Sequence, residues 1–370
     1  MWTYKQPVTV LFGNGTIQQV IPLAHQRGWK RGIVVATPHV VANSVVDDLV
    51  RQGKEILTDV FSHITPNPDV QDVDDCADII RKGAYDFVVA IGGGSAIDLA
   101  KAAASVGCTP DSIRLYHGTG RELPPNHLPL VAVPTTAGTG SEVTSVAVLS
   151  DIRQHKKSPI ASDNFFPEYA IIDPELTYDM PAYLTACCGM DVLSHALEGY
   201  WSIHHQPICD IYAVHAASLV FQYLRQACQQ PKNAEAREKL CEASVIAGMS
   251  FALPKTTASH ACSFPLTNQY HIPHGEACGL TLDYFARLNG QHDIRVQQLA
   301  HQLGFQDSEV LGDEIFQLKK DIGLRTDLRD LQLDKKAIQD LVAASHHPNV
   351  KNNPYPITDE ILQDLYQRLV

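Results

Sequence analysis

Two residues that can bind a metal ion, Asp191 and His195, stand four apart in a run without an internal proline. On a helix they would project from one face, a turn apart, as two ligands of one ion must. His260, on a predicted helix, and His274, in a predicted loop, could supply two further ligands. One carboxylate and three imidazoles suit Zn²⁺ or Fe²⁺, whereas Ca²⁺ prefers oxygen throughout. The spacing also fits a solvated helix face, because 17 histidines make such pairs frequent by chance.

The composition indicates a soluble protein and leaves a small-molecule substrate possible. The chain has 370 residues, 45% of them hydrophobic and 19% charged, so it can bury a sizeable core in two or three domains. Its net charge of −12 argues against nucleic acid or an anionic membrane as a partner, although a pocket's local field could still accept a small anion. No run approaches the roughly 20 apolar residues of a membrane span, and the start lacks an apolar signal core. We therefore expect a cytoplasmic protein.

Up to about residue 175, strand-like and helix-like segments alternate. The runs Val34–Ala36 and Phe87–Ile91 are continuously apolar, as in parallel strands covered on both faces. Between the strands, residues 38–52 and 70–83 carry apolar residues at helical spacing. This alternation predicts an α/β domain with an open, mostly parallel sheet. Strands are predicted at residues 8–12, 32–37, 55–61, 86–91, 128–133, 146–149 and 169–172.

A glycine-rich turn follows the predicted strand at 86–91. It reads Gly92-Gly93-Gly94-Ser95 and leads into a predicted helix that contains Asp98. Three glycines at such a turn let a phosphate approach the backbone, and the helix N-terminus offers N–H groups and a partial positive charge. We predict that this turn binds the pyrophosphate of a nucleotide, with Asp98 nearby. Because the run is not the G-x-G-x-x-G fingerprint, a plain tight turn is the alternative.

A second loop of small and hydroxyl-bearing residues follows another apolar strand. It reads Pro134-Thr135-Thr136-Ala137-Gly138-Thr139-Gly140-Ser141-Glu142 and could close over a nucleotide from the other side. The predicted cofactor residues outside the glycine turn are Thr37, Thr135, Thr136, Thr139, Gly140, Ser141 and Lys157.

The pattern changes near residue 178. From about Pro181, helical stretches follow one another without a convincing strand, and Pro174 and Pro181 bracket the boundary. We predict an α/β dinucleotide-binding domain over residues 1–178 and an all-helical metal- and substrate-binding domain over residues 179–370. Helices are predicted at residues 191–200, 208–228, 234–252, 256–267, 280–289, 294–303, 308–322, 335–344 and 358–369.

In combination, these motifs resemble the iron-containing (group III) alcohol dehydrogenase family over essentially the whole chain. The resemblance implies the architecture shared with dehydroquinate synthase, and Asp191, His195, His260 and His274 as catalytic ligands of Fe²⁺ or Zn²⁺. It also implies an NADH- or NADPH-linked oxidoreductase that reduces a small aldehyde to a primary alcohol, and we expect a homodimer. Further matching elements are Phe12-Gly13-Asn14-Gly15, Asn67-Pro68, Lys101, Asp173-Pro174, Gly189-Met190, Glu198 and Pro273-His274-Gly275.

The chain departs from the family beside the third ligand. Family members often carry a further histidine four residues after it, where this chain has Phe264. A proton relay through that histidine is therefore not available, and ordered water, the ribose hydroxyl or His271 could supply the proton.

The residues before His260 suggest a sub-family. Lys255-Thr256-Thr257, together with residues 260–267, resembles the branch that reduces phosphonoacetaldehyde to 2-hydroxyethylphosphonate. On a continuous helix both threonines would share the ligand-bearing face, and the helix N-terminus with Lys255 would hold the phosphonate. A helix start with a solvated lysine and two capping hydroxyls is the alternative. The predicted substrate residues are Lys255, Thr256, Thr257, Phe264 and His271.

The end of the second predicted strand bears on the choice of cofactor. NAD-specific family members resemble one another in an acidic residue there, whereas this chain reads Ala36-Thr37-Pro38. Without that carboxylate nothing repels a 2′-phosphate, and Thr37 or His39 could hydrogen-bond one. We therefore expect a preference for NADPH over NADH, unless Thr37 merely ends a strand.

Three other functions stay open. A general short-chain alcohol dehydrogenase would use the same site. A lyase of the dehydroquinate synthase type shares the architecture, but that type resembles a site of one Glu and two His with a basic pocket. A binding protein without turnover is disfavoured because the four ligands and both loops are intact.

Overall fold

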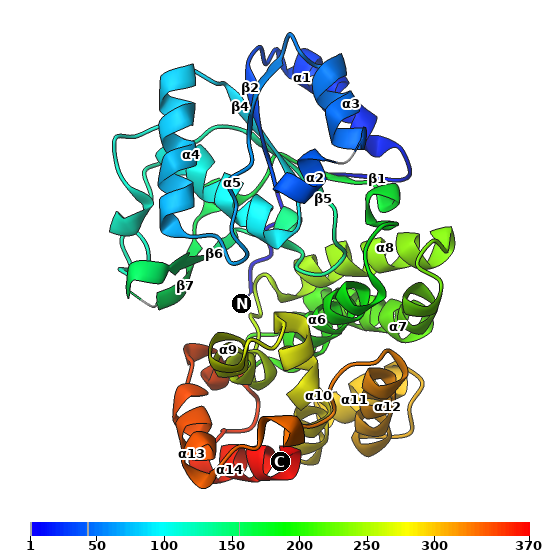
Figure 1. Cartoon of the computed structure of the whole chain (residues 1–370). Coiled ribbons are helices and arrows are strands. Elements are labelled where there is room, and N and C mark those ends of the chain that lie inside the picture. Colours follow the sequence, from blue (N-terminus) through cyan, green and yellow to red (C-terminus); the bar gives the residue numbers. More distant parts are fainter. Residues whose placement is uncertain (1, 43, 155) are drawn as a thin grey trace. The chain divides into compact units, whose positions relative to one another are not determined.

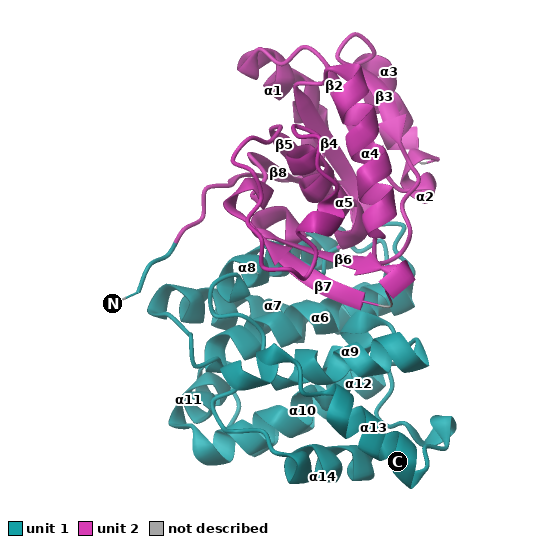
Figure 2. Ribbon diagram, turned by 90° about the vertical axis from the view of Figure 1, so that its left-hand side faces the viewer, with its two compact units in different colours: residues 1–4, 137–140, 178–370 teal, residues 5–136, 141–177 magenta. Residues whose placement is uncertain are grey.

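The structure is a computed structural model and describes residues 2–42, 44–154 and 156–370. The chain forms two compact units, which Figure 2 shows in different colours. The sheet unit comprises Lys5–Thr136 and Ser141–Thr177. The helical unit comprises Tyr178–Val370, the residues up to Tyr4, and Ala137–Gly140. The middle of the second predicted cofactor loop thus belongs to the helical unit.

The sheet unit is built on a six-stranded parallel sheet with the order β1-β8-β5-β4-β2-β3 (Figure 1). Ala36 pairs with Ile91 and Gly92 pairs with Pro134, so β2, β4 and β5 end level with one another. The prediction of an α/β domain with a mostly parallel sheet is confirmed. The strands are β1 Thr9–Phe12, β2 Gly32–Ala36, β3 Leu57–Phe61, β4 Phe87–Gly92, β5 Leu130–Pro134 and β8 Tyr169–Ile172.

Helices cover both faces of this sheet (Figure 1). Along β4, Val88 joins a hydrophobic core with α4 and α5, whereas Val89 joins another core with α1 and α3. A strand buried on both faces needs apolar residues at every position, which explains the continuous run. The helices are α1 Val20–Arg27, α2 Pro38–Val41, α3 Ser44–Gln52, α4 Val70–Gly83 and α5 Gly94–Val106.

A separate antiparallel hairpin pairs β6 (Val146–Asp151) with β7 (Lys156–Ala161). The sequence does not predict β7, because Ile160 is its one buried residue and the strand therefore lacks an apolar pattern. The predicted helix at 38–52 is divided into α2 and α3, and residue 43 between them lies outside the described residues.

The helical unit is arranged around α6, which contacts α7, α8 and α10. Every residue of α6 from Thr185 to Trp201 except Cys188 is buried, so this helix is apolar on most sides, with buried polar side chains at Thr185, Asp191, Ser194, His195 and Glu198. Within the described part of this unit no strand occurs. The helices are α6 Ala182–Trp201, α7 Pro207–Gln229, α8 Ala234–Phe251, α9 Ala258–Tyr270, α10 His274–His292, α11 Ile294–Gln302, α12 Ser308–Asp321, α13 Lys335–Ala344 and α14 Asp359–Leu369.

Two helices begin elsewhere than predicted. The prediction that α9 starts at residue 256 is wrong: it starts at Ala258, because Thr257 has φ −126° and ψ −133°, which lie outside the right-handed helical region. The prediction of a loop at His274 is also wrong, since this residue begins α10 directly after Pro273. Both differences change how the site is built.

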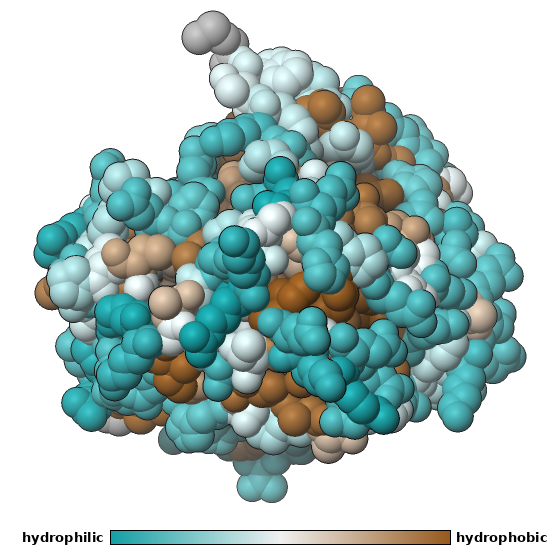
Figure 3. All heavy atoms as spheres, turned by 90° about the horizontal axis from the view of Figure 1, so that it is seen from above, coloured by the Kyte–Doolittle hydropathy of each residue, from teal (hydrophilic) through white to brown (hydrophobic). Residues whose placement is uncertain are grey.

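The face of the molecule in Figure 3 is mostly hydrophilic, with smaller hydrophobic groups between the polar ones. Among the residues that the structure describes, no helix is long and apolar enough to cross a membrane.

Gly140 tests the close approach of the 137–140 segment to α8. Its φ is 61°, and a Cβ there would lie 2.6 Å from the Cα of Gly248. Gly15 has a φ of 73° but open space around it, so Gly15→Ala is the matched control. In this control, the free energy of unfolding should fall by only about 1–2 kcal/mol, the cost of a left-handed backbone at a residue with a Cβ. Gly140→Ala should lose about 1–3 kcal/mol more from overlap, as measured by urea unfolding. Equal losses would contradict the close approach.

Candidate metal centre and cofactor loops

The four predicted metal ligands lie together in the helical unit. Oδ1 of Asp191 is 3.8 Å from Nε2 of His195, which stands one turn later on α6. The same oxygen is 3.6 Å from Nε2 of His260 and 3.8 Å from Nε2 of His274. Four ligands about 2.1 Å from one ion in a tetrahedron are about 3.4 Å apart. The three distances therefore suit a divalent ion bound between these side chains.

Unpartnered polar atoms support the same conclusion. Oδ1 of Asp191 and Nε2 of His260 are buried and have no hydrogen-bond partner among the described residues. A buried polar atom without a partner costs about 1–3 kcal/mol, and a carboxylate costs more. A cation between them would remove that cost, so the residues present fit the metal that their types predict.

Glu198 orients His260 from behind. Oε2 of Glu198 accepts a hydrogen bond from Nδ1 of His260, which leaves Nε2 bare toward Asp191. A second-layer carboxylate of this kind fixes the tautomer and raises the basicity of a metal-binding histidine. The sequence places Glu198 seven residues after Asp191, on the same face of the helix, but assigns it no role.

The other oxygen of Glu198 caps the start of α9. Oε1 accepts from the backbone N–H groups of Thr257, Ser259 and His260, at 3.1, 2.8 and 3.3 Å. It also accepts from the hydroxyl of Thr257 at 2.7 Å. A carboxylate is favoured at a helix N-terminus, where N–H groups lack partners within the helix. One buried side chain thus holds both the helix and its ligand.

The remaining histidines are held by different neighbours. Oγ of Ser263 lies 3.2 Å from Nδ1 of His274 and donates to the carbonyl of His260, so Nδ1 of His274 can donate to it. That arrangement again leaves Nε2 bare. The ring of His195 stacks on Phe251, with centroids 4.0 Å apart and planes 6° apart. Stacking fixes the plane of His195 without a polar partner on Nδ1 in the described part of the chain.

Burial and the charges of neighbouring side chains shift the pKa values of these four residues. Burial alone would raise the pKa of Asp191, but the surrounding imidazoles hold it well below its usual value. Burial lowers the pKa of His195 to about 4, so that imidazole is neutral near pH 7. Burial also opposes protonation of His260 and His274, yet adjacent anionic groups raise the pKa of both.

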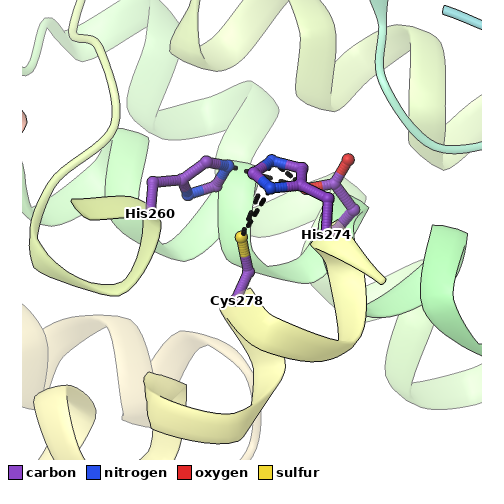
Figure 4. Close-up of side chains that lie close together, drawn as sticks. His260, His274 and Cys278 are labelled. Atoms are coloured by element: carbon purple, nitrogen blue, oxygen red, sulfur yellow. Dashed lines mark hydrogen bonds and ion pairs between the residues drawn. The ribbon is translucent and has the colours of Figure 1, made fainter. Parts of the chain in front are cut away.

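Cys278 lies at the same centre, although the sequence did not single it out. It stands one turn after His274 on α10, and Figure 4 shows its sulfur beside the two imidazoles of His260 and His274. Burial would raise the pKa of the Cys278 thiol, but these imidazoles lower it to about 7. The i, i+4 spacing of His274 and Cys278 was available in the sequence, but the predicted loop at His274 concealed it.

In the sheet unit, the predicted glycine turn lies beside the first part of the second predicted cofactor loop, residues 134–136. Gly92 ends β4 and Gly93 precedes α5, which has no side-chain cap at its first turn. The N–H of Thr135 donates to the carbonyl of Gly92, and a Cβ on Gly93 would lie 3.2 Å from Oγ1 of Thr136. The backbone from Gly92 to Ser95 is therefore close to the second loop at the carboxyl end of the sheet, where nucleotides bind in such folds.

Two predicted cofactor residues, Asp98 and Ser141, use their side chains within the protein. Asp98 accepts from the hydroxyl of Ser141 at 2.5 Å and from the N–H of Val148 at 2.9 Å. Lys101 donates to the same hydroxyl at 2.9 Å and to the carbonyl of Val146 at 2.8 Å. Burial lowers the pKa of Lys101 to about 8. This network fixes the second loop against α5, so Asp98 and Ser141 position the loop.

The structure places the other predicted cofactor residues separately. Thr37 directly follows β2, and Lys157 on β7 donates to Oδ1 of Asn67 at 2.7 Å. Thr139 and Gly140 lie in the segment that belongs to the helical unit.

The expected phosphonate clamp at the start of α9 needs correction. The N–H groups of Thr257, Ser259 and His260 donate to Glu198, so these three are not available to a substrate anion. Thr257 also accepts from Nε1 of Trp201, and its hydroxyl is fully used. The hydroxyl of Thr256 accepts from Nδ2 of Asn349 at 2.7 Å. Lys255 is exposed, and its ammonium donates to the carbonyl of Ala252.

Phe264 lies beside the metal centre, whereas His271 does not contact it in any described interaction. The ring of Phe264 is 6.2 Å from that of His274 and 4.4 Å from that of His347. His271 is exposed at the end of α9. Sequence reasoning missed His347, whose Nδ1 accepts from the N–H of Asn349 and whose pKa burial lowers. Its Nε2 is therefore a hydrogen-bond donor next to Phe264.

Comparison with known proteins identifies the family. The iron-containing alcohol dehydrogenase family matches residues 7–174, and the C-terminal domain of the same family matches residues 185–370. The chain belongs to the iron-containing alcohol dehydrogenases. The family predicted from the sequence motifs is thereby confirmed, and with it an oxidoreductase.

Several members of this family are similar over nearly the whole chain. The 1,3-propanediol dehydrogenase of Citrobacter freundii is 34% identical over 345 residues, covering 90% of this chain and 89% of that protein. Alcohol dehydrogenase 4 of Schizosaccharomyces pombe is 32% identical over 360 residues, covering 95% and 85%. The crystal structure of sulfoacetaldehyde reductase from Bifidobacterium kashiwanohense, in complex with NAD⁺, is 55% identical with a TM-score of 0.98. It covers 100% of this chain and 98% of that one.

Glu198→Gln tests the second layer of the metal centre. The amide cannot hold the His260 imidazole as an anion does, so affinity for Zn²⁺ should fall about 10–100-fold, measured by calorimetric titration of metal-free protein. Glu242→Gln is the matched control, because Glu242 also bonds a histidine, His215 at 2.9 Å, but away from the centre. Unchanged affinity in Glu198→Gln would contradict the role of this carboxylate.

The pKa values predict how metal binding depends on pH. An imidazole must lose its proton to bind a metal, and the pKa of His260 and His274 is raised above 6.5 in the metal-free protein. Protons therefore compete with the metal at a higher pH than for ordinary histidines. Affinity for Zn²⁺ should fall steadily between about pH 8 and about pH 6, by up to about tenfold per unit for each imidazole. Constant affinity across this range would contradict the raised values.

Proposed function

We propose that the chain reduces a short aldehyde with an anionic head group to its primary alcohol, using a bound divalent ion and a nicotinamide cofactor. The observation that carries the proposal is the approach of three imidazole Nε2 atoms to within 3.8 Å of one oxygen of Asp191. Membership of the iron-containing alcohol dehydrogenases supports reduction rather than the lyase alternative.

The residues of the site would have separate roles in the reaction. Asp191, His195, His260 and His274 would hold the ion, Fe²⁺ or Zn²⁺. When bound, the ion supplies a Lewis acid that polarises a carbonyl oxygen, and the nicotinamide supplies the hydride. Glu198 and Ser263 bind Nδ1 of His260 and His274, which leaves Nε2 of each free to bind the ion. Phe264 is an apolar neighbour of the centre that excludes water.

A charged head group is supported by two independent resemblances. Full-length identity of 55% with a sulfoacetaldehyde reductase supports a sulfonate. The shorter resemblance around Lys255-Thr256-Thr257 supports a phosphonate. Both groups are tetrahedral oxyanions attached to the carbon next to the aldehyde, and we favour sulfoacetaldehyde because the similarity extends over the whole chain. Lys255 offers an exposed positive charge for either of them.

The cofactor is proposed to rest on the Gly92–Ser95 turn through its pyrophosphate. The similar reductase holds NAD⁺, which supports NADH for this chain as well. The preference for NADPH, expected because Thr37 stands where a carboxylate would repel a 2′-phosphate, stays a prediction. Comparing kcat/KM for the two cofactors decides between them, and a clear preference for NADH would overturn it.

The experiment that tests this function is a substrate comparison. Protein loaded with Fe²⁺ or Zn²⁺ is supplied with each cofactor and with sulfoacetaldehyde, phosphonoacetaldehyde or propanal, and oxidation of the cofactor is followed by absorbance. We expect the largest kcat/KM with a charged aldehyde. Equal turnover of propanal would favour a general alcohol dehydrogenase, and no turnover of any aldehyde would favour the lyase or binding alternatives.

Lys255→Ala tests the head-group contact. Loss of one charge-assisted bond, worth about 1.5–3 kcal/mol, should raise KM for the charged aldehyde roughly tenfold or more and leave propanal nearly unchanged. Because Lys255 has a left-handed backbone, Lys255→Asn should give the same kinetic loss with a more favourable conformation. Lys320→Ala removes an exposed lysine on α12 and should change neither substrate. Equal losses on both substrates in either Lys255 variant would end the assignment.

A further inference from the structure

The four metal ligands differ in exposure, and the difference indicates from which side the centre can be reached. The side chain of His274 is 35% exposed, whereas those of Asp191, His195 and His260 are between 5% and 8% exposed. A substrate carbonyl would therefore approach an ion at this centre past His274. The groups around His274 are those that would contact the rest of the substrate.

Phe264 and His347 follow one another on this exposed side. The ring of Phe264 lies 6.2 Å from that of His274, and the ring of His347 lies 4.4 Å from that of Phe264. The phenyl ring thus stands between the metal ligands and His347. This order places His347 toward the far end of a substrate whose carbonyl oxygen is at the ion, and in a short charged aldehyde that far end is the head group.

The imidazole of His347 presents one defined donor. Its Nδ1 accepts a hydrogen bond from the N–H of Asn349 at 3.3 Å, and the side chain thereby caps the short 3-10 helix Pro348–Asn352. A neutral imidazole that accepts at Nδ1 carries its proton on Nε2. Among the residues that the structure describes, none accepts a hydrogen bond from Nε2 of His347. Because this half-buried ring is held in one orientation, the Nε2–H is available to a ligand.

The segment that carries His347 is fixed to the turn before α9. Nδ2 of Asn349 donates to Oγ1 of Thr256 at 2.7 Å, and Nδ2 of Asn352 donates to the carbonyl of Thr256 at 2.9 Å. Lys255, which immediately precedes Thr256, is exposed. His347 and Lys255 therefore flank one hydrogen-bonded contact. They offer an N–H donor and an ammonium, and both kinds of group bind the oxygens of a sulfonate or phosphonate.

We propose that His347 is a specificity-determining residue that donates a hydrogen bond from Nε2 to an oxygen of the substrate's anionic head group. The inference deepens the proposed function, on which it rests. The rigid imidazole gives the contact a direction, whereas the flexible Lys255 supplies the charge. The bond favours a charged aldehyde over propanal, because propanal offers this N–H no acceptor.

Two substitutions separate the head-group contact from the capping role of His347. In His347→Asn, Oδ1 can replace Nδ1 as the cap, since asparagine is a favoured capping residue, but the side chain is too short to reach the position of Nε2. In His347→Gln, the amide nitrogen can reach that position, whereas the cap is lost. KM for the preferred charged aldehyde should rise roughly tenfold or more in His347→Asn, as for any lost hydrogen bond to a charged group, and much less in His347→Gln. KM for propanal should stay nearly unchanged in both variants.

His346→Asn is the matched control, because His346 is the neighbouring histidine but is exposed and bonds Asp359 at 2.6 Å. This variant should change KM for neither substrate. An unchanged KM for the charged aldehyde in His347→Asn, or equal losses on the charged aldehyde and on propanal, would overturn the inference. A loss in His347→Gln with none in His347→Asn is the result of a cap alone and would overturn it as well.

The unmodified protein separates this inference from the function on which it rests. If it shows no preference for a charged aldehyde over propanal, the proposed function fails and the inference fails with it. If it shows that preference and His347→Asn retains it in full, the proposed function stands and only the role of His347 is refuted.

Discussion

The structure of the helical unit depends on a buried carboxylate that needs a positive partner. Oδ1 of Asp191 is surrounded by imidazoles at 3.6 to 3.8 Å and has no hydrogen-bond donor among the described residues. An uncompensated buried charge is strongly destabilising, and without a metal only imidazoles that take up protons offset it. A divalent ion compensates the charge directly, so metal binding and stability of this unit should be linked. The arrangement of α6, α9 and α10 follows from bringing these groups to one point.

Glu198 connects that requirement to the substrate end of the site. One of its oxygens accepts a hydrogen bond from Nδ1 of His260 and fixes that ring. The other accepts hydrogen bonds from backbone N–H groups at the start of α9. A helix N-terminus that would otherwise attract an anion is thereby neutralised within the protein. The anionic head group that we propose for the substrate would then need a side-chain partner, and Lys255, exposed on a left-handed turn just before α9, is the group that the sequence also indicates.

Periodic features of the sequence predicted the fold well, whereas features that depend on local backbone geometry were not predicted. Continuous apolar runs such as 87–91 identify doubly covered strands, and the spacing of Asp191 and His195 identifies one helical face. By contrast, β7 has no apolar pattern, and the positive φ of Lys255 cannot be read from its residue type. Because a loop was expected at His274, Cys278 was not recognised as its neighbour one turn later on α10. Glu198 was recognised as part of a family motif, but its role was not predicted, because a second-layer contact requires knowing which helices meet.

The account stands on one ion held by Asp191, and the stoichiometry of metal binding measures this directly. Calorimetric titration of metal-free protein with Fe²⁺ or Zn²⁺ should give one ion per chain in the unmodified protein and none in Asp191→Asn. Asp210→Asn is the matched control, since Asp210 pairs with His205 at 2.9 Å in the same unit and should not affect the ion. One full equivalent of metal in Asp191→Asn, or none in the unmodified protein, would contradict the account.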